Sequence, residues 1–106
     1  LLPWTPDLVT IDVSFIAITA LLPGLTAVCP PSGRLLTMVK PQFELPRDRV
    51  PKGGVVRDDS DRAAAAQLVI DAATQLGWER VGQADSQVSG PAGNREIFVL
   101  FRRSEL

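Results

Sequence analysis

The chain contains no histidine and a single cysteine, Cys29, among its 106 residues. The absence of histidine excludes His-based catalytic triads, imidazole general bases and histidine ligands to metals. We therefore expect no metal site. One cysteine permits no internal disulfide bond, which favours a reducing compartment such as the cytoplasm.

An excess of charge of one sign is also lacking. Eleven Lys and Arg residues stand against 12 Asp and Glu residues, and the net charge is −1. This balance argues against a strongly basic nucleic-acid module, so any nucleic-acid partner must be attracted largely by residues outside this chain. A composition of 45% hydrophobic and 22% charged residues is typical of a globular protein, and the length allows one domain at most.

The longest uncharged apolar run covers residues 13–29. It is shorter than the roughly 20 residues that a membrane-spanning helix needs, and Pro23 and Gly24 interrupt it. We expect a buried strand and helix in this region, and no stable membrane insertion.

Hydrophobic patterns in the first half predict a strand, a helix and a second strand. Residues 7–13 are nearly continuously apolar, which indicates a strand buried on both faces. A helix is predicted over residues 16–28, with Ser14 or Thr19 as its cap. Pro23 is expected either to kink this helix or to lie in the first turn of its main part. A second apolar strand follows over residues 34–39.

The second half begins with a polar segment, residues 42–59, which we expect to be a long functional loop. The next helix is predicted to end at Gly77. Its cap is expected among Asp58, Asp59 and Ser60. The residues expected to line its sheet-facing side are Ala64, Leu68, Ala72 and Leu76.

Two further strands are expected over residues 78–88 and 96–101, joined by a turn at residues 89–94. The order strand, helix, strand, helix, strand, strand predicts an α/β fold. We expect a mostly parallel sheet that ends in an antiparallel hairpin.

Three ionisable residues lie at strand ends that should meet at one edge of this sheet. Asp12 and Lys40 come at the carboxyl ends of the first two strands, and Glu96 opens the last strand. Ligands of open α/β sheets bind outside the carboxyl ends of the strands. A lysine held between two carboxylates is well oriented to act on a hydroxyl group, which favours group transfer over hydrolysis.

Each of these residues has a simpler interpretation. Asp12 could cap the helix that follows it. Lys40 could be a solvated strand end, and Glu96 could pair with Arg95 or Arg102 on the surface. Convergence of all three on one edge favours a functional site, because clusters of opposite charge are concentrated at such sites.

The segment with Gly53 and Gly54 lacks the glycine fingerprints of nucleotide-binding loops. A flexible turn is the interpretation we favour for any nucleotide role. A lid or an RNA-facing loop stays open, with Lys52 and Arg57 as phosphate contacts. Cys29, beside two prolines, is expected to be a small apolar filler rather than a nucleophile.

Four segments together resemble the TlyA family, FtsJ-like ribosomal RNA 2′-O-methyltransferases of which some also carry the name hemolysin. The match runs from about residue 6 to residue 102, in order. The four segments are Thr10-Ile11-Asp12-Val13-Ser14-Phe15-Ile16, Val39-Lys40-Pro41-Gln42-Phe43-Glu44, Lys52-Gly53-Gly54-Val55-Val56-Arg57-Asp58 and Gly93-Asn94-Arg95-Glu96.

The resemblance implies the later half of a Rossmann-like class I methyltransferase sheet and S-adenosyl-L-methionine as methyl donor. It assigns three members of a Lys-Asp-Lys-Glu catalytic tetrad to Asp12, Lys40 and Glu96. Lys40 would deprotonate or polarise the ribose 2′-hydroxyl of a cytidine in ribosomal RNA. Donor contacts are implied at Asp12, Val13 and Ser14. RNA contacts are implied at Gln42, Phe43, Lys52, Arg57 and Arg95.

The first tetrad lysine, the glycine-rich donor loop and an S4-like RNA-binding domain lie upstream in the family and are absent from residues 1–106. We therefore expect a partial methyltransferase domain that is inactive alone, with an exposed strand edge that favours self-association. Two alternatives stay open: a methyltransferase-like module that binds RNA or protein without catalysis, and a membrane-active hemolysin.

Overall fold

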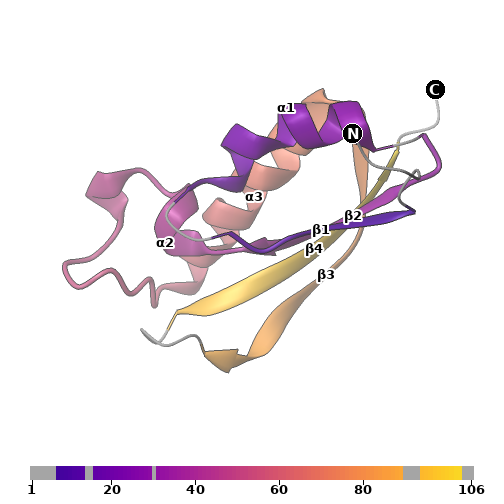
Figure 1. Cartoon of the computed structure of the whole chain (residues 1–106). Coiled ribbons are helices and arrows are strands. Elements are labelled where there is room, and N and C mark those ends of the chain that lie inside the picture. Colours follow the sequence, from indigo (N-terminus) through magenta and orange to yellow (C-terminus); the bar gives the residue numbers. More distant parts are fainter. Residues whose placement is uncertain (1–6, 14–15, 30, 90–93, 104–106) are drawn as a thin grey trace.

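The computed structural model describes residues 7–13, 16–29, 31–89 and 94–103, which form one four-stranded sheet covered by helices (Figure 1). The strands are β1 (Leu8–Ile11), β2 (Arg34–Val39), β3 (Trp78–Ser89) and β4 (Arg95–Arg103). Their order in the sheet is β1-β2-β4-β3. β1 and β2 are parallel, and β4 is antiparallel to both of its neighbours. The α/β fold with an antiparallel terminal hairpin is confirmed. The sheet is mixed, because β4 lies between β2 and β3 and only β1 and β2 pair in parallel among the described strands.

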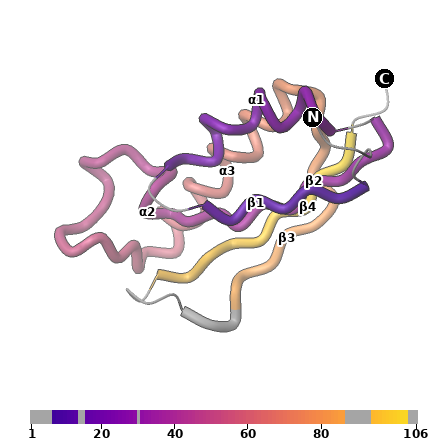
Figure 2. Tube along the Cα trace, viewed as in Figure 1, coloured from indigo at the N-terminus to yellow at the C-terminus, as the bar shows by residue number. Residues whose placement is uncertain are grey.

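Helices α1 (Ile18–Val28) and α3 (Asp59–Gln75) lie on the same face of the sheet, as both Figure 1 and Figure 2 show. Alternate residues of β2 and β4 are buried beneath them, because successive side chains of a strand point to opposite faces. These buried residues are Leu35, Thr37, Val39, Ile97, Val99 and Phe101. The core therefore lies between this face and the two helices.

The opposite face of the sheet, which we call the open face, carries Leu36, Met38, Phe98 and Leu100. These apolar side chains are only partly buried, and Leu8 at the edge of the sheet is 52% exposed. In the described part of the chain no helix lies over this face (Figure 1). The sheet is thus covered on one side, and the prediction that the first strand is buried on both faces is wrong for β1.

α1 begins at Ile18 with Ala17 as its N-cap, and no side chain of the cap residue binds the first turn. The predicted cap at Thr19 is wrong, since Thr19 lies inside the helix, and Ser14 lies outside the described residues. The Glu44 carboxylate, from a distant segment, accepts a hydrogen bond from the Ile18 N–H instead. Pro23 lies inside α1, beyond its first turn.

The predicted start and end of α3 are both confirmed. The Asp58 carboxylate accepts hydrogen bonds from the N–H groups of Ser60 and Asp61, and Gly77 after the helix has a φ of 90°. The predicted buried face is wrong at Leu68, which is 42% exposed. The run of four alanines before it is apolar on every side, so helical periodicity could not fix which face turns inward. The residues of α3 that are buried are Arg62, Ala65, Ala66, Val69 and Ala73.

Residues 42–59 are not the structureless loop that the sequence suggested. They include most of the short helix α2 (Pro41–Glu44) and a 3-10 turn, η1 (Arg47–Arg49). Pro41 at the first position of α2 has a fixed φ that suits a helix start, which explains why so short a helix forms directly after β2.

No helix among the described residues has both the length and the apolar character to cross a bilayer. α1, which takes up most of the apolar run, has 11 residues and packs on the sheet.

Candidate active site

The structure brings Asp12, Lys40 and Glu96 to one rim of the sheet. Asp12 directly follows the last residue of β1, and Lys40 directly follows β2. The antiparallel register of β2 and β4 ends with the pair Val39–Ile97, so Lys40 and Glu96 are the next residues on each strand at this rim. Lys40 keeps an extended backbone (φ −107°, ψ 103°), which continues the alternation of β2 and directs its side chain to the open face.

Lys40 and Asp12 form an ion pair. The Lys40 Nζ lies 2.8 Å from a carboxylate oxygen of Asp12. The Lys40 side chain is 13% exposed and the Asp12 side chain is 57% exposed, so the cation is largely withdrawn from water while its partner faces solvent. An ammonium group held in this way has a defined direction and can donate a hydrogen bond to an oxygen that arrives at the rim.

The simpler interpretations of these residues fare differently. The alternative that Asp12 caps the following helix is wrong, because α1 begins at Ile18 and its N-cap is Ala17. Arg102 pairs with Glu79, at 2.7 Å, in place of the surface pair with Glu96 that the sequence allowed.

Glu44, the last residue of α2, connects the segment after Lys40 to the start of α1. Its carboxylate is buried and accepts a hydrogen bond from the Ile18 N–H, and its second oxygen lies 3.5 Å from the Thr19 hydroxyl. Burial raises the pKa of Glu44, and the hydrogen bonds from Ile18 and Thr19 oppose that shift. No local sequence signal indicates this contact, which joins positions 26 residues apart.

Asn94 makes a comparable connection on the other side of the rim. The residue is 4% exposed. The amide Nδ2 donates to the Gly54 carbonyl over 2.7 Å, and the Oδ1 accepts from the Val56 N–H over 2.8 Å. The segment with Lys52 and Arg57 is thereby attached to the chain two residues before Glu96. Asn94 lies within the Gly93-Asn94-Arg95-Glu96 segment, but its distance along the sequence from Gly54 predicts no contact.

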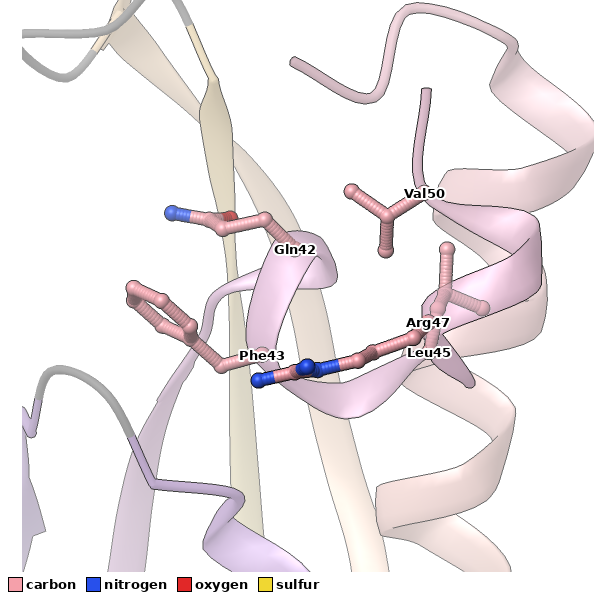
Figure 3. A pocket seen from close by; sticks show the side chains of 5 residues that line it. All are labelled: Gln42, Phe43, Leu45, Arg47 and Val50. Atoms are coloured by element: carbon pink, nitrogen blue, oxygen red, sulfur yellow. The ribbon is translucent and has the colours of Figure 1, made fainter. Parts of the chain in front are cut away.

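The residues expected to contact RNA divide into two groups. Lys52, Arg57 and Arg95 are exposed, whereas Gln42 and Phe43 are half-buried. Gln42 and Phe43 line a hollow of about 580 Å³ beside α2, together with Leu45, Arg47 and Val50. Figure 3 shows Gln42 and Phe43 projecting from α2 toward the same side. Sequence reasoning missed Arg47, which lies in the 3-10 turn η1 and lines the same hollow as Phe43.

Cys29 is buried at the end of α1. Burial raises the pKa of its thiol, and the charge of Arg103 only partly opposes this, so the sulfur stays protonated near neutral pH. A protonated, buried thiol packs as a small apolar group. Among the described residues, no three His, Cys, Asp or Glu side chains are grouped as a metal site would require.

Solved structures share this architecture. A crystal structure of a protein described as a hemolysin from Lactococcus lactis superimposes with a TM-score of 0.89 at 35% sequence identity, covering 95% of this chain and 48% of the other. The N-methyltransferase NodS from Bradyrhizobium japonicum, in complex with S-adenosyl-L-homocysteine, gives a TM-score of 0.56 at 17% identity over 93% of this chain and 46% of its own. The second likeness shows that the fold is that of a class I methyltransferase.

Sequence relatives point the same way. The chain is 41% identical over 96 residues to the 16S/23S rRNA (cytidine-2′-O)-methyltransferase TlyA of Mycobacterium tuberculosis, covering 91% of this chain and 36% of the relative. It is 34% identical to Hemolysin A of Brachyspira hyodysenteriae, over 91% of this chain and 40% of the relative. The chain thus spans about two fifths or less of the length of these relatives. The family profile of the FtsJ-like methyltransferases matches residues 1–103, and the chain belongs to that family.

Proposed function

We propose that this chain supplies the ribose-activating half of an S-adenosylmethionine-dependent ribosomal RNA 2′-O-methyltransferase. The observation that carries the proposal is the 2.8 Å ion pair of Lys40 and Asp12 at the carboxyl rim, with Glu96 as the next residue across from Lys40. The names of relatives that cover most of the chain support an RNA substrate and cytidine 2′-hydroxyl methylation. A ribosomal RNA substrate would also place the activity in the cytoplasm.

S-adenosylmethionine, when bound, supplies an electrophilic methyl group whose bond to sulfur breaks as the ribose oxygen bonds to it. Lys40 acts on the ribose 2′-hydroxyl, as a neutral amine that accepts its proton or as an ammonium group that polarises it. The ion pair with Asp12 orients the Lys40 Nζ. Glu96, on the neighbouring strand, flanks Lys40 and orients the hydroxyl or receives the proton in turn.

The residues of this chain fit one edge of a donor site. The Asp12 carboxylate is more than half exposed at the rim, where it can accept hydrogen bonds from a ligand, and Val13 follows it. Ser14, the third residue expected at the donor, lies outside the described residues. Residues 12–17 contain no glycine, so the turn after β1 is not a glycine-rich donor loop. The rest of the donor site is proposed to come from sequence outside residues 1–106.

We place RNA along the hollow beside α2 and the exposed cations near the rim. Phe43 presents an aromatic ring and Arg47 a guanidinium group to the hollow. Aromatic rings and arginine planes are the groups on which unpaired RNA bases stack. Lys52 and Arg57, held near Glu96 by Asn94, are suited to phosphate contacts, as is Arg95.

The test replaces Lys40 by Ala in an intact parent methyltransferase whose later half is this chain. Methyl transfer from radiolabelled donor to ribosomal RNA is expected to fall about 100- to 10,000-fold, the usual contribution of acid–base catalysis. Arg80→Ala removes an exposed cation from β3, away from the rim, and should leave the rate unchanged. Unchanged methyl transfer by the Lys40 variant would favour a module that binds RNA or protein without catalysis.

For the isolated 106-residue chain, we expect no methyl transfer and only weak donor binding. Titration calorimetry with S-adenosylmethionine should show no saturation in the micromolar range. Micromolar binding by these residues alone would mean that the chain contains a complete donor site, contrary to the proposal.

We also propose that the isolated chain self-associates through β1, which forms one end of the sheet order. The outer edge of an end strand presents N–H and C=O groups that another strand can pair with. The molar mass from light scattering should rise with concentration. A monomer at high concentration would contradict this.

A further inference from the structure

The ion pair with Asp12 is a weak means of holding Lys40 by itself. More than half of the Asp12 side chain faces solvent, where water competes for its oxygens. Ion pairs with exposed partners contribute little to the fixation of either side chain. A group that must meet a hydroxyl oxygen at hydrogen-bond distance needs further support, because misplacement by about 1 Å is costly to catalysis.

The structure provides a second attachment four residues beyond Lys40. Lys40 is the N-cap of α2, and Glu44 is the last residue of that helix. The Glu44 carboxylate binds the N–H of Ile18, the first residue of α1, and approaches the Thr19 hydroxyl at 3.5 Å. α1 is the helix that follows Asp12 along the chain. The segment from Asp12 to α1 and the segment from Lys40 to Glu44 are thus joined at both ends.

The two attachments differ in their surroundings. Glu44 is 9% exposed, whereas its counterpart Asp12 faces water. The first turn of α1 has no acidic residue and no capping side chain of its own. In the described structure, the Glu44 carboxylate is therefore the side chain that accepts a hydrogen bond from the N-terminal end of α1. Loss of this buried contact would release α2 from α1 and leave it held by its packing on α3. Pro41 leaves little freedom between Lys40 and α2, so a displaced α2 would carry Lys40 with it.

We propose that Glu44 is a positioning residue, which holds Lys40 opposite Asp12 by fixing α2 to the N-terminus of α1. The inference rests on the proposed function of Lys40 and extends it to a residue that touches neither substrate nor donor. It also accounts for the presence of a carboxylate in a buried position of the Lys40-Pro41-Gln42-Phe43-Glu44 segment. A purely structural cap would stabilise α1 and leave the place of Lys40 unchanged.

The sequence allows a direct test, since Lys40 and Lys52 are its only two lysines. Labelling of the 106-residue chain with 15N-lysine yields two side-chain ammonium signals by NMR, and exposed Lys52 serves as the internal reference. Asp12→Asn first gives the position of the Lys40 signal without its ion pair. Glu44→Ala is expected to move the Lys40 signal to that position and to leave the Lys52 signal in place. Glu44→Gln, which keeps one acceptor oxygen of the same reach, should retain the wild-type Lys40 signal.

Two further variants complete the design. Glu79→Ala removes an exposed carboxylate of β3 and should move neither signal. Should the backbone amide spectrum show that Glu44→Ala is unfolded, Glu44→Asp replaces it, because the shorter side chain keeps the charge but falls short of Ile18. The same displacement of the Lys40 signal is then expected.

A wild-type Lys40 signal in the folded Ala or Asp variant would overturn the proposal, as would a Gln variant that shifts the signal as far as Ala does. An unmoved signal in Asp12→Asn would also overturn it, because no ion pair would then exist to be positioned. None of these outcomes depends on catalysis. Full methyl transfer by Lys40→Ala would refute the proposed function without touching this result.

Discussion

Replacement of Asn94 by Ala removes one buried and one partly buried hydrogen bond at once. The Asn94 amide donates to the Gly54 carbonyl and accepts from the Val56 N–H, and both bonds are shorter than 3 Å. An alanine side chain leaves both backbone groups without this partner. Because Val56 is buried, water cannot easily replace the lost acceptor at its N–H.

The expected cost follows from the surroundings of the two groups. A buried N–H group without a partner costs about 1–3 kcal/mol. The Gly54 carbonyl is only partly buried, so hydration offsets much of its loss and adds roughly 1 kcal/mol at most. We expect the free energy of unfolding to fall by about 1–4 kcal/mol, a substantial share of the roughly 5–15 kcal/mol typical of a domain.

Urea unfolding followed by tryptophan fluorescence measures this change, since Trp78 is buried in the core. Gln67→Ala is the matched control: it removes an exposed amide that donates to Asp71 over 2.7 Å, and should change stability by less than about 0.5 kcal/mol. Hydrogen exchange at the Val56 amide should accelerate in the Asn94 variant. The reasoning would be refuted by equal stabilities of the two variants together with a protected Val56 amide.

Asn94→Asp separates the two bonds. The introduced carboxylate can still accept from Val56 but faces the Gly54 carbonyl with a negative charge, so burial and repulsion should raise its pKa in the folded state. A raised folded pKa means that stability is gained as the pH falls. The deficit relative to wild type should therefore shrink between pH 7 and about pH 4. A stability deficit that stays constant over this pH range would show that a hydrogen-bond donor to the Gly54 carbonyl does not contribute to stability.

Two further predictions concern stability away from the rim. Arg103 donates to the carbonyls of Thr26 and Cys29 and stacks over Trp78 at 4.4 Å. Arg103→Ala should therefore lower the free energy of unfolding by about 1.5–3 kcal/mol. The control Arg102→Ala breaks an exposed ion pair and should lower it by about 0–1 kcal/mol. Equal losses in urea unfolding would contradict the assignment. Hydrogen bonds from Ser60 lower the pKa of Asp58, so its contribution to stability is present above its unfolded value and is lost as the pH falls through the folded pKa. Asp58→Ala should thus lower the melting temperature at pH 7 and have a smaller effect below about pH 4, while a pH-independent difference would rule out the charged cap.

The elements that could be predicted from sequence are those whose signals are local. β2 was predicted at residues 34–39, as found, because a continuous apolar run is enclosed by Gly33 and Pro41. The ends of α3 were found from Asp58 and Gly77, which act on their own backbone neighbours. The start of α1 could not be predicted, because the carboxylate that caps it belongs to the distant Glu44. No residue next to the helix indicates where it begins.

The rim was predictable for a different reason. Asp12, Lys40 and Glu96 each stand at a strand end, and strand direction alone brings such ends to one edge of a sheet. The place of β4 between β2 and β3 was not determined by that argument, although it is what sets Glu96 across from Lys40. The contacts of Glu44 and Asn94 depend on how loops fold over one another, for which neither spacing nor periodicity holds information.

The open face has a consequence for how a complete enzyme would assemble. The strands that bear Leu36, Met38, Phe98 and Leu100 are the same strands whose ends carry Lys40 and Glu96, and Lys40 is directed to that side. A polypeptide that shields these apolar side chains from water would therefore lie beside the Lys40 amine. Under the proposed function, burial of the open face and completion of the methyl-transfer site would then occur in a single docking step.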